Sequence, residues 1–122
     1  MVSGYQKALE QMWRDRCTVY HRVKVTDPAT GLTDFVEQPL LEEEPCKLSF
    51  ETLGENGGDH VATVSQTVKL FLRASAVIPA GCRIVVRREN EPQRQWCYAK
   101  SGEAGVFSHH QELFLVPFER YT

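Results

Sequence analysis

The sequence lacks the marks of a membrane, secreted or nucleotide-binding protein. No stretch approaches the ~20 apolar residues that span a bilayer, and residues 1–16 contain no apolar core or cleavage site of a signal peptide. No P-loop or GxGxxG motif occurs, so no nucleotide cofactor is expected. The cysteines are widely spaced and form no CxxC pair, which predicts reduced, structural thiols in a reducing cytoplasm. They are Cys17, Cys46, Cys82 and Cys97.

What is present fits one globular domain over residues 1–122. Hydrophobic residues make up 42% of the chain and charged residues 25%, close to the average for soluble domains. A chain of this length buries enough surface to form one core without disulfides or metals. The formal net charge of −2 argues against a general nucleic-acid binder.

Residues 3–16 are predicted to form a helix. Ser3 and Gln6 have the spacing of a capping box, and an apolar stripe follows with the helical period. Its members are Tyr5, Ala8, Leu9, Met12 and Trp13. We expect this helix to cover one end or face of the remaining structure.

Residues 17–121 alternate between apolar and polar side chains, which is typical of β-strands with one buried face. Residues 17–38 have the form of a hairpin around an Asp27-Pro28 turn, and residues 109–121 are expected to form a long last strand. No βαβ unit is apparent. The prediction is therefore a mainly β fold, an antiparallel barrel or sandwich of about seven strands with one N-terminal α-helix.

Two segments are expected to interrupt the strands, besides a loop at 100–105. Glu42, Glu43, Glu44 and Pro45 break the alternation. Residues 52–62 are predicted to be a mobile loop, because their glycines and acidic residues have no apolar anchor. The glycine-rich and acidic centre of that loop is Gly54, Glu55, Asn56, Gly57, Gly58 and Asp59.

Charge is divided unevenly along the chain. Residues 34–59 contain eight acidic residues and one lysine, whereas residues 60–101 contain seven basic and two acidic residues. Opposite patches would favour head-to-tail contacts between copies, and such contacts can close into rings. The candidate interface charges are Glu42, Glu43, Glu44, Arg83, Arg87 and Arg88. The alternative is that the two segments pair within one sheet and neutralise each other.

Candidate catalytic or metal-binding residues are few. Cys17 and His21 share a strand face but lack two further ligands, so a core cysteine and a half-buried histidine are expected. His110 and Glu112 could interact on one face, with His109 opposite, but no nucleophile signature accompanies them. We therefore expect no enzymatic activity, no cofactor and no metal, with a small-ligand or enzyme barrel using His109, His110 and Glu112 as the alternative.

Several stretches share the pattern of one family. They are residues 17–20, 24–33, 44–50, 68–72, 78–86, 101–103 and 109–113. From Arg16 onward the chain resembles small head-tail connector proteins of phages and prophages of Gram-positive bacteria, and it is similar to the head-closure, or stopper, component. The matching motifs are turn and strand patterns, and the helix has no counterpart among them.

The resemblance implies a structural component of the virion at the head-tail junction. It implies a β-barrel subunit that forms a ring below the portal and adaptor, retains packaged DNA and docks the tail-completion proteins. A loop that gates the channel in relatives corresponds to residues 52–62 here. A tail terminator or other neck ring is an alternative, as is nucleic-acid binding, for which the candidates are Arg83, Arg87, Arg88 and Arg94.

Overall fold

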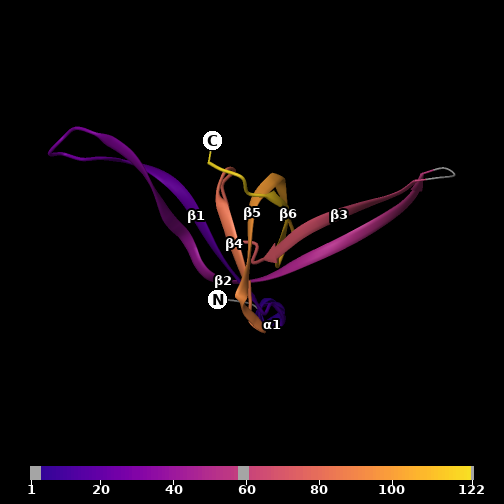
Figure 1. Ribbon diagram of the computed structural model, residues 1–122. Helices are drawn as coiled ribbons and strands as arrows, with labels where there is room; N and C mark the ends of the chain where they lie inside the picture. Colours follow the sequence, from indigo (N-terminus) through magenta and orange to yellow (C-terminus); the bar gives the residue numbers. More distant parts are fainter. Residues whose placement is uncertain (1–3, 58–60, 122) are drawn as a thin grey trace.

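The computed structural model describes residues 4–57 and 61–121, which form one helix and six strands (Figure 1). The elements are α1 (Gly4–Met12), β1 (Asp15–Thr26), β2 (Thr33–Gly57), β3 (Val61–Leu72), β4 (Arg83–Arg88), β5 (Glu91–Val106) and β6 (Gln111–Pro117). Within this described part, no helix has the length and hydropathy needed to cross a membrane.

The six strands form a closed antiparallel barrel in the order β1-β2-β3-β6-β5-β4. The first and fourth strands close it, because β1 pairs with β4 from Asp15↔Arg88 to Tyr20↔Arg83. The mainly β, antiparallel prediction is confirmed, and the structure decides for a barrel over a sandwich. Closure gives every strand two partners near the barrel centre, which removes exposed sheet edges there.

Alternate residues of the strands fill the barrel interior, as the period of two predicts. The largest fully buried side chains are those of Leu70, Leu72, Ile84, Leu113, Val19, Val86, Cys17 and Cys46. Ala76, Ile78 and Cys82, from the segment between β3 and β4, complete this core. Each buried aliphatic side chain contributes about 1.5–3 kcal/mol relative to exposure, so the interior rows provide most of the driving force for folding.

The expected interruption at residues 42–45 is wrong, because β2 continues through it as one strand of 25 residues. Pairing between β1 and β2 instead shifts register between Cys17 and Val19 and again between Val19 and Tyr20. Glu43 has a φ of 49° at this irregularity. A β-bulge accommodates extra residues without ending the ladder. One bulged strand therefore replaces two, and the count is six strands rather than seven.

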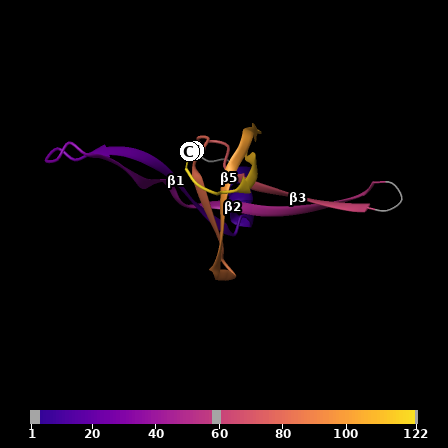
Figure 2. The same ribbon diagram turned by 45° about the horizontal axis from the view of Figure 1, so that its top comes forward.

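Two hairpin arms project from opposite sides of the barrel (Figures 1 and 2). The first, which we call the β1–β2 arm, is residues 21–38, beyond Tyr20, the last residue of β1 that pairs with β4. Its turn follows the prediction, because Asp27 accepts a hydrogen bond from the Ala29 amide (2.8 Å) and Gly31 has a φ of 73°. The second arm, the β2–β3 arm, consists of residues 51–57 of β2 and 61–67 of β3. It lies outside the part of β3 that pairs with β6, which begins at Val68.

The predicted loop at 52–62 is wrong over most of its length. β2 pairs with β3 from Thr52↔Gln66 out to Gly57↔Val61, so backbone hydrogen bonds order glycines that no side-chain pattern anchors. Residues 58–60 lie outside the described part, and the mobility of the tip stays a prediction. The loop expected at 100–105 is likewise mostly strand, with a bulge between Ser101 and Gly105 where Gly102 has a φ of 74°.

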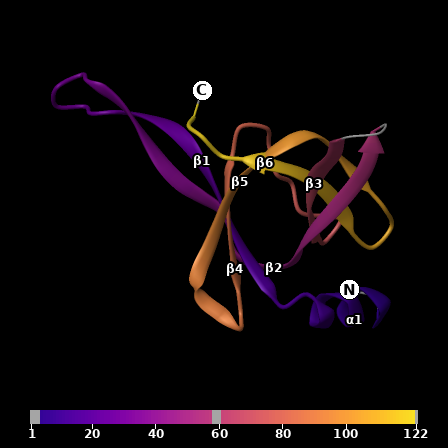
Figure 3. The same cartoon turned by 45° about the vertical axis from the view of Figure 1, so that its right-hand side comes forward.

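The helix is shorter than the predicted 3–16. It ends at Met12, and β1 begins at Asp15, whose carboxylate accepts a hydrogen bond from the Leu48 amide (2.8 Å). This hydrogen bond holds Asp15 beside β2 as the first residue of β1. The predicted apolar stripe of the helix ends two residues earlier, at Trp13. Trp13 is buried directly after the helix, and α1 lies against one end of the barrel (Figure 3). Ser3 of the predicted cap lies outside the described residues.

Candidate functional site

The outer face of the β2–β1–β4 sheet brings the oppositely charged segments together. Partners in an antiparallel pair share a face, so the pairs Tyr20↔Arg83 and Arg22↔Glu37 place these four side chains on the same outer surface. β4 is distant in sequence from β2, yet both flank β1. Arginines of β4 therefore reach across β1 to glutamates of β2.

Glu37 is the centre of one such contact. Arg83 donates to both of its carboxylate oxygens, and the Tyr121 hydroxyl donates to Oε2 at 2.6 Å. The hydrogen bond from Arg83 is the main reason that the pKa of Glu37 is lowered. Burial and the hydrogen bond to Glu37 raise the pKa of Tyr121 to about 12. The site therefore keeps its carboxylate ionised and its phenol protonated near neutral pH.

Further ion pairs occupy most of the predicted interface charges. Arg87 pairs with Glu43, and Arg73 pairs with Glu44 and donates to the Ser75 hydroxyl at 2.7 Å. The sixth predicted charge, Glu42, is exposed and forms no ion pair with a described residue. Neutralisation within one sheet, the alternative considered for the charge split, is what these pairs show. A role of the six charges between subunits stays a prediction.

The β1–β2 arm leaves large apolar side chains uncovered. The exposed fraction is 45% for Val25, 71% for Leu32, 51% for Phe35 and 39% for Val36. Val23 and Val25 belong to the same row of β1 side chains as Cys17 and Val19, which are buried in the barrel. They lie beyond Tyr20, where the pairing of β1 with β4 stops, so this part of the row is outside the barrel. The alternation is visible in the sequence, but only the position of β4 shows that Val23 and Val25 lie outside the core.

The predicted gating residues lie at the far end of the β2–β3 arm. Gly54, Glu55, Asn56 and Gly57 are the last residues of β2 and pair with residues 61–64. Gly58 and Asp59 fall outside the described residues. The structure therefore replaces a long loop by a long two-stranded ribbon, whose tip is the part of β2 and β3 farthest from the barrel (Figure 1).

The histidines lie in the turn before β6 rather than within a strand starting at residue 109, so the predicted start of that strand is wrong. His109 packs edge-on against Tyr5 of α1 with ring centroids 4.8 Å apart. His110 stacks on Phe107, also at 4.8 Å, and its Nε2 lies 3.8 Å from Glu112 Oε2. The predicted approach of His110 to Glu112 is confirmed, while His109 has a separate aromatic contact that anchors the helix.

Cysteine and metal chemistry finds little support in the geometry. Cys17 is fully buried and His21 is half-buried, as expected. No group of three or more potential metal ligands occurs among residues 4–57 and 61–121. The four cysteines are free thiols, of which only Cys97 is exposed. Hydrogen bonding to Cys17 together with burial raises the pKa of the Cys46 thiol.

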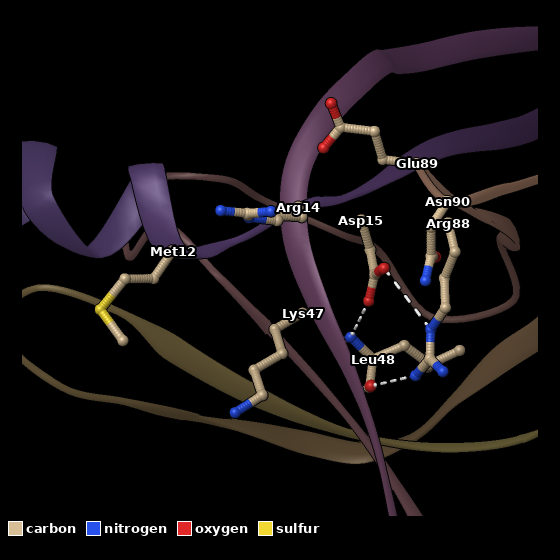
Figure 4. Close-up of a pocket in the computed structure, with 8 residues that line it drawn as sticks. All are labelled: Met12, Arg14, Asp15, Lys47, Leu48, Arg88, Glu89 and Asn90. Atoms are coloured by element: carbon tan, nitrogen blue, oxygen red, sulfur yellow. Dashed lines mark hydrogen bonds and ion pairs between the residues drawn. The ribbon is translucent and has the colours of Figure 1, made fainter.

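A hollow of about 410 Å³ opens where α1 meets the barrel (Figure 4). On one side of it, Asp15 is bonded to Leu48 and lies 3.5 Å from Arg88 Nε, and Arg88 donates to the Leu48 carbonyl at 2.9 Å. Arg14 and Lys47 extend to the other side, away from this bonded group (Figure 4). The hollow thus has a charge-paired side and a cationic side, and the Glu89 carboxylate also lines it.

Comparison with known proteins gives one structural likeness. No family model matches the chain, and no curated protein matches it. A solved structure of the phage-like element PBSX protein xkdH from Bacillus subtilis is similar, with a TM-score of 0.47 and 17% sequence identity. The likeness covers 84% of this chain and 91% of the xkdH chain. The function of this chain has to be inferred from its own residues.

Proposed function

We propose that the chain is a structural component of a phage virion at the junction of head and tail. In this role it assembles as a ring below the portal and adaptor, retains packaged DNA and offers a docking surface to the tail. The support is the sequence resemblance to head-closure proteins together with the closed barrel and its two projecting arms. The role is non-enzymatic and requires no cofactor.

The apolar β1–β2 arm is the observation that carries the proposal. An isolated two-stranded hairpin is at best marginally stable in water. Val25 and Leu32 of this arm are exposed apolar side chains, and Phe35, on the opposite face from Val25, is half exposed with the Arg22 guanidinium 4.4 Å from its ring centroid. Exposed apolar surface of this kind marks sites of protein contact. A neighbouring subunit or an adjacent neck protein that covers the arm would supply the missing burial.

The internal ion pairs change how the contacts between subunits are expected to work. Because Glu43, Glu44, Arg83 and Arg87 are already paired within the chain, a neighbour would have to break those pairs to use them. Exposed ion pairs are worth only about 0–1 kcal/mol each, so exchanging them gains little. Apolar burial at the arms is therefore the proposed source of assembly energy, and charge sets orientation.

The β2–β3 arm is the proposed gate. In the ring the end of this arm, where Gly54–Gly57 pair with residues 61–64, would project into the central channel. The backbone pairing out to Gly57↔Val61 makes the arm a ribbon that carries the tip to a defined place. Acidic residues there would repel phosphates rather than hold them, which suits a gate that must release DNA.

A deletion in the phage or prophage that encodes the chain tests the proposal. Loss of a head-closure ring should give heads that empty of DNA and complete tails that stay unjoined, seen by electron microscopy. Loss of a tail terminator should instead give DNA-filled heads beside tails of irregular length. Normal, joined particles would contradict a neck role, and complementation by the intact gene is the control.

A further inference from the structure

The basic corner of the molecule is formed by cations around the start of β1, of which Lys7, Arg14 and Lys47 are exposed and Arg16 and Arg88 are half-buried. It consists of Lys7, Arg14, Arg16, Lys47 and Arg88. These residues line two adjoining hollows of about 410 and 600 Å³, which share Arg14 and Glu89. The chain as a whole is acidic, so five cations at one corner are a local exception.

Of the two carboxylates that line the hollows, Asp15 is paired and Glu89 is exposed. Asp15 is buried, and its carboxylate accepts a hydrogen bond from the Leu48 amide and lies 3.5 Å from Arg88 Nε. Arg16 is held by backbone carbonyls, donating to Trp13 at 3.0 Å and Asp15 at 3.1 Å. Lys7, Arg14 and Lys47 are exposed and form no ion pair with any residue in the described ranges. Three cations thus remain available to a ligand, with Glu89 the unpaired carboxylate among the described residues that line the hollows.

We propose that this basic corner binds the phosphodiester backbone of duplex nucleic acid without reading its sequence. Arg14 and Lys47 project from the hollow on the same side, where they can contact phosphate oxygens (Figure 4). Gln11 and Asn90 line the same hollows and add amide donors. Arginine, lysine and side-chain amides are the groups that contact phosphates in sequence-independent binding.

Charge complementarity favours a nucleic-acid backbone over a second copy of the chain. The acidic segment of another copy would present Glu42 unpaired, but Glu37, Glu43 and Glu44 are each bound by an arginine of their own chain. A duplex offers an unbroken row of unpaired phosphates. Of the arginines considered for nucleic acid from the sequence, Arg83, Arg87 and Arg94 lie in ion pairs outside the two hollows, and Arg88, within the corner, is paired with Asp15.

This inference deepens the proposed function, on which its biological setting rests, since a neck ring would lie close to packaged DNA. Binding is measured on the isolated full chain with duplex DNA of random sequence. With a slope of about 0.9 per phosphate contact, three contacts predict an affinity loss of about 40-fold between about 50 and 200 mM salt.

The double variant Arg14→Gln, Lys47→Gln should reduce that loss to about 3- to 4-fold, because about one phosphate contact remains. The matched control is Lys24→Gln, Arg120→Gln, which removes the same two charges from exposed positions away from the corner. The control should bind as the unaltered chain does. A control that weakens as much as the corner variant would overturn the proposal, as would absence of binding at about 50 mM salt.

Two further measurements separate this proposal from the proposed function. If the corner variant loses salt-sensitive self-association in sedimentation while DNA affinity is unchanged, the corner holds another copy and the proposal is wrong. If DNA binding follows the expected pattern but deletion of the gene leaves normal particles, the corner binds nucleic acid and the neck role fails. Circular dichroism of each variant confirms that the barrel remains folded.

Discussion

The guanidinium of Arg83 lies 4.6 Å from the centre of the Tyr20 ring, which it crosses to reach Glu37. The aromatic face of β1 thus supports an ion pair between two strands that do not touch each other. A guanidinium over an aromatic ring contributes about 0.5–1 kcal/mol at exposed sites. The contact links three strands at the seam where the barrel closes.

Replacing Glu37 by Gln should lower the free energy of unfolding by about 0.5–1 kcal/mol at neutral pH, as expected for an exposed ion pair. The lowered pKa of Glu37 means that its contribution is complete above the unfolded value of about 4.3 and is lost as pH falls through the folded value. Urea denaturation of both proteins from neutral to acid pH checks this. A difference between the two proteins that does not shrink as the pH is lowered into the acid range would contradict the assignment.

Tyr121 should make the protein sensitive to alkali. Its folded pKa of about 12 exceeds the ordinary value of about 10, so its stabilising effect is present below pH ~10 and is lost between the two values. In Tyr121→Phe, the part of the loss of folding stability at alkaline pH that comes from this phenol should be absent. Ultraviolet difference absorbance, which follows phenol ionisation, should show one high-pKa tyrosine fewer. Tyr5, which is well exposed, supplies the comparison as Tyr5→Phe.

Asp15→Ala should destabilise the fold by about 1–3 kcal/mol, because the buried Leu48 amide loses its acceptor. Asp15→Asn should cost less, since an amide oxygen can still accept that bond. Chemical denaturation measures both. Equal costs for the two variants would show that the charge opposite Arg88 matters more than the hydrogen bond to Leu48.

The apolar arm should matter for assembly and little for folding. The variant Val25→Thr, Leu32→Thr keeps strand-compatible side chains but removes apolar surface, so stability should change by less than about 0.5 kcal/mol. Joining of heads to tails, measured by complementation of the deleted gene, should fall severely. The variant Val77→Thr, Val106→Thr alters equally exposed residues outside the arm and should complement fully. Equal loss in both variants would contradict a special role of the arm.

The thiols should react in two classes. Cys97 is exposed and should be modified by a maleimide in the folded protein. Cys17, Cys46 and Cys82 are buried, and burial raises the thiol pKa of Cys46 and Cys82, so they should react only after unfolding. Mass spectrometry of the protein before and after denaturant counts the adducts. Rapid labelling of Cys46 in the native protein would contradict the closed barrel.

Alternation along the chain was sufficient to predict the β class and the hairpin at 17–38, because the buried rows at Cys17 and Leu70 follow the period of two. It could not predict that Glu43 forms a bulge inside one strand, since a bulge leaves no signal in the composition. The pairing of Glu37 with Arg83 was also out of reach. It depends on β4 lying beside β1, a long-range choice that local pattern does not encode.

β2 extends without a break from the turn of one arm toward the tip of the other. Its 25 residues, at ~3.3 Å each, correspond to as much as about 80 Å of backbone. Both arms are therefore built on the same strand, and the register irregularity at Glu43 lies between them within the barrel wall.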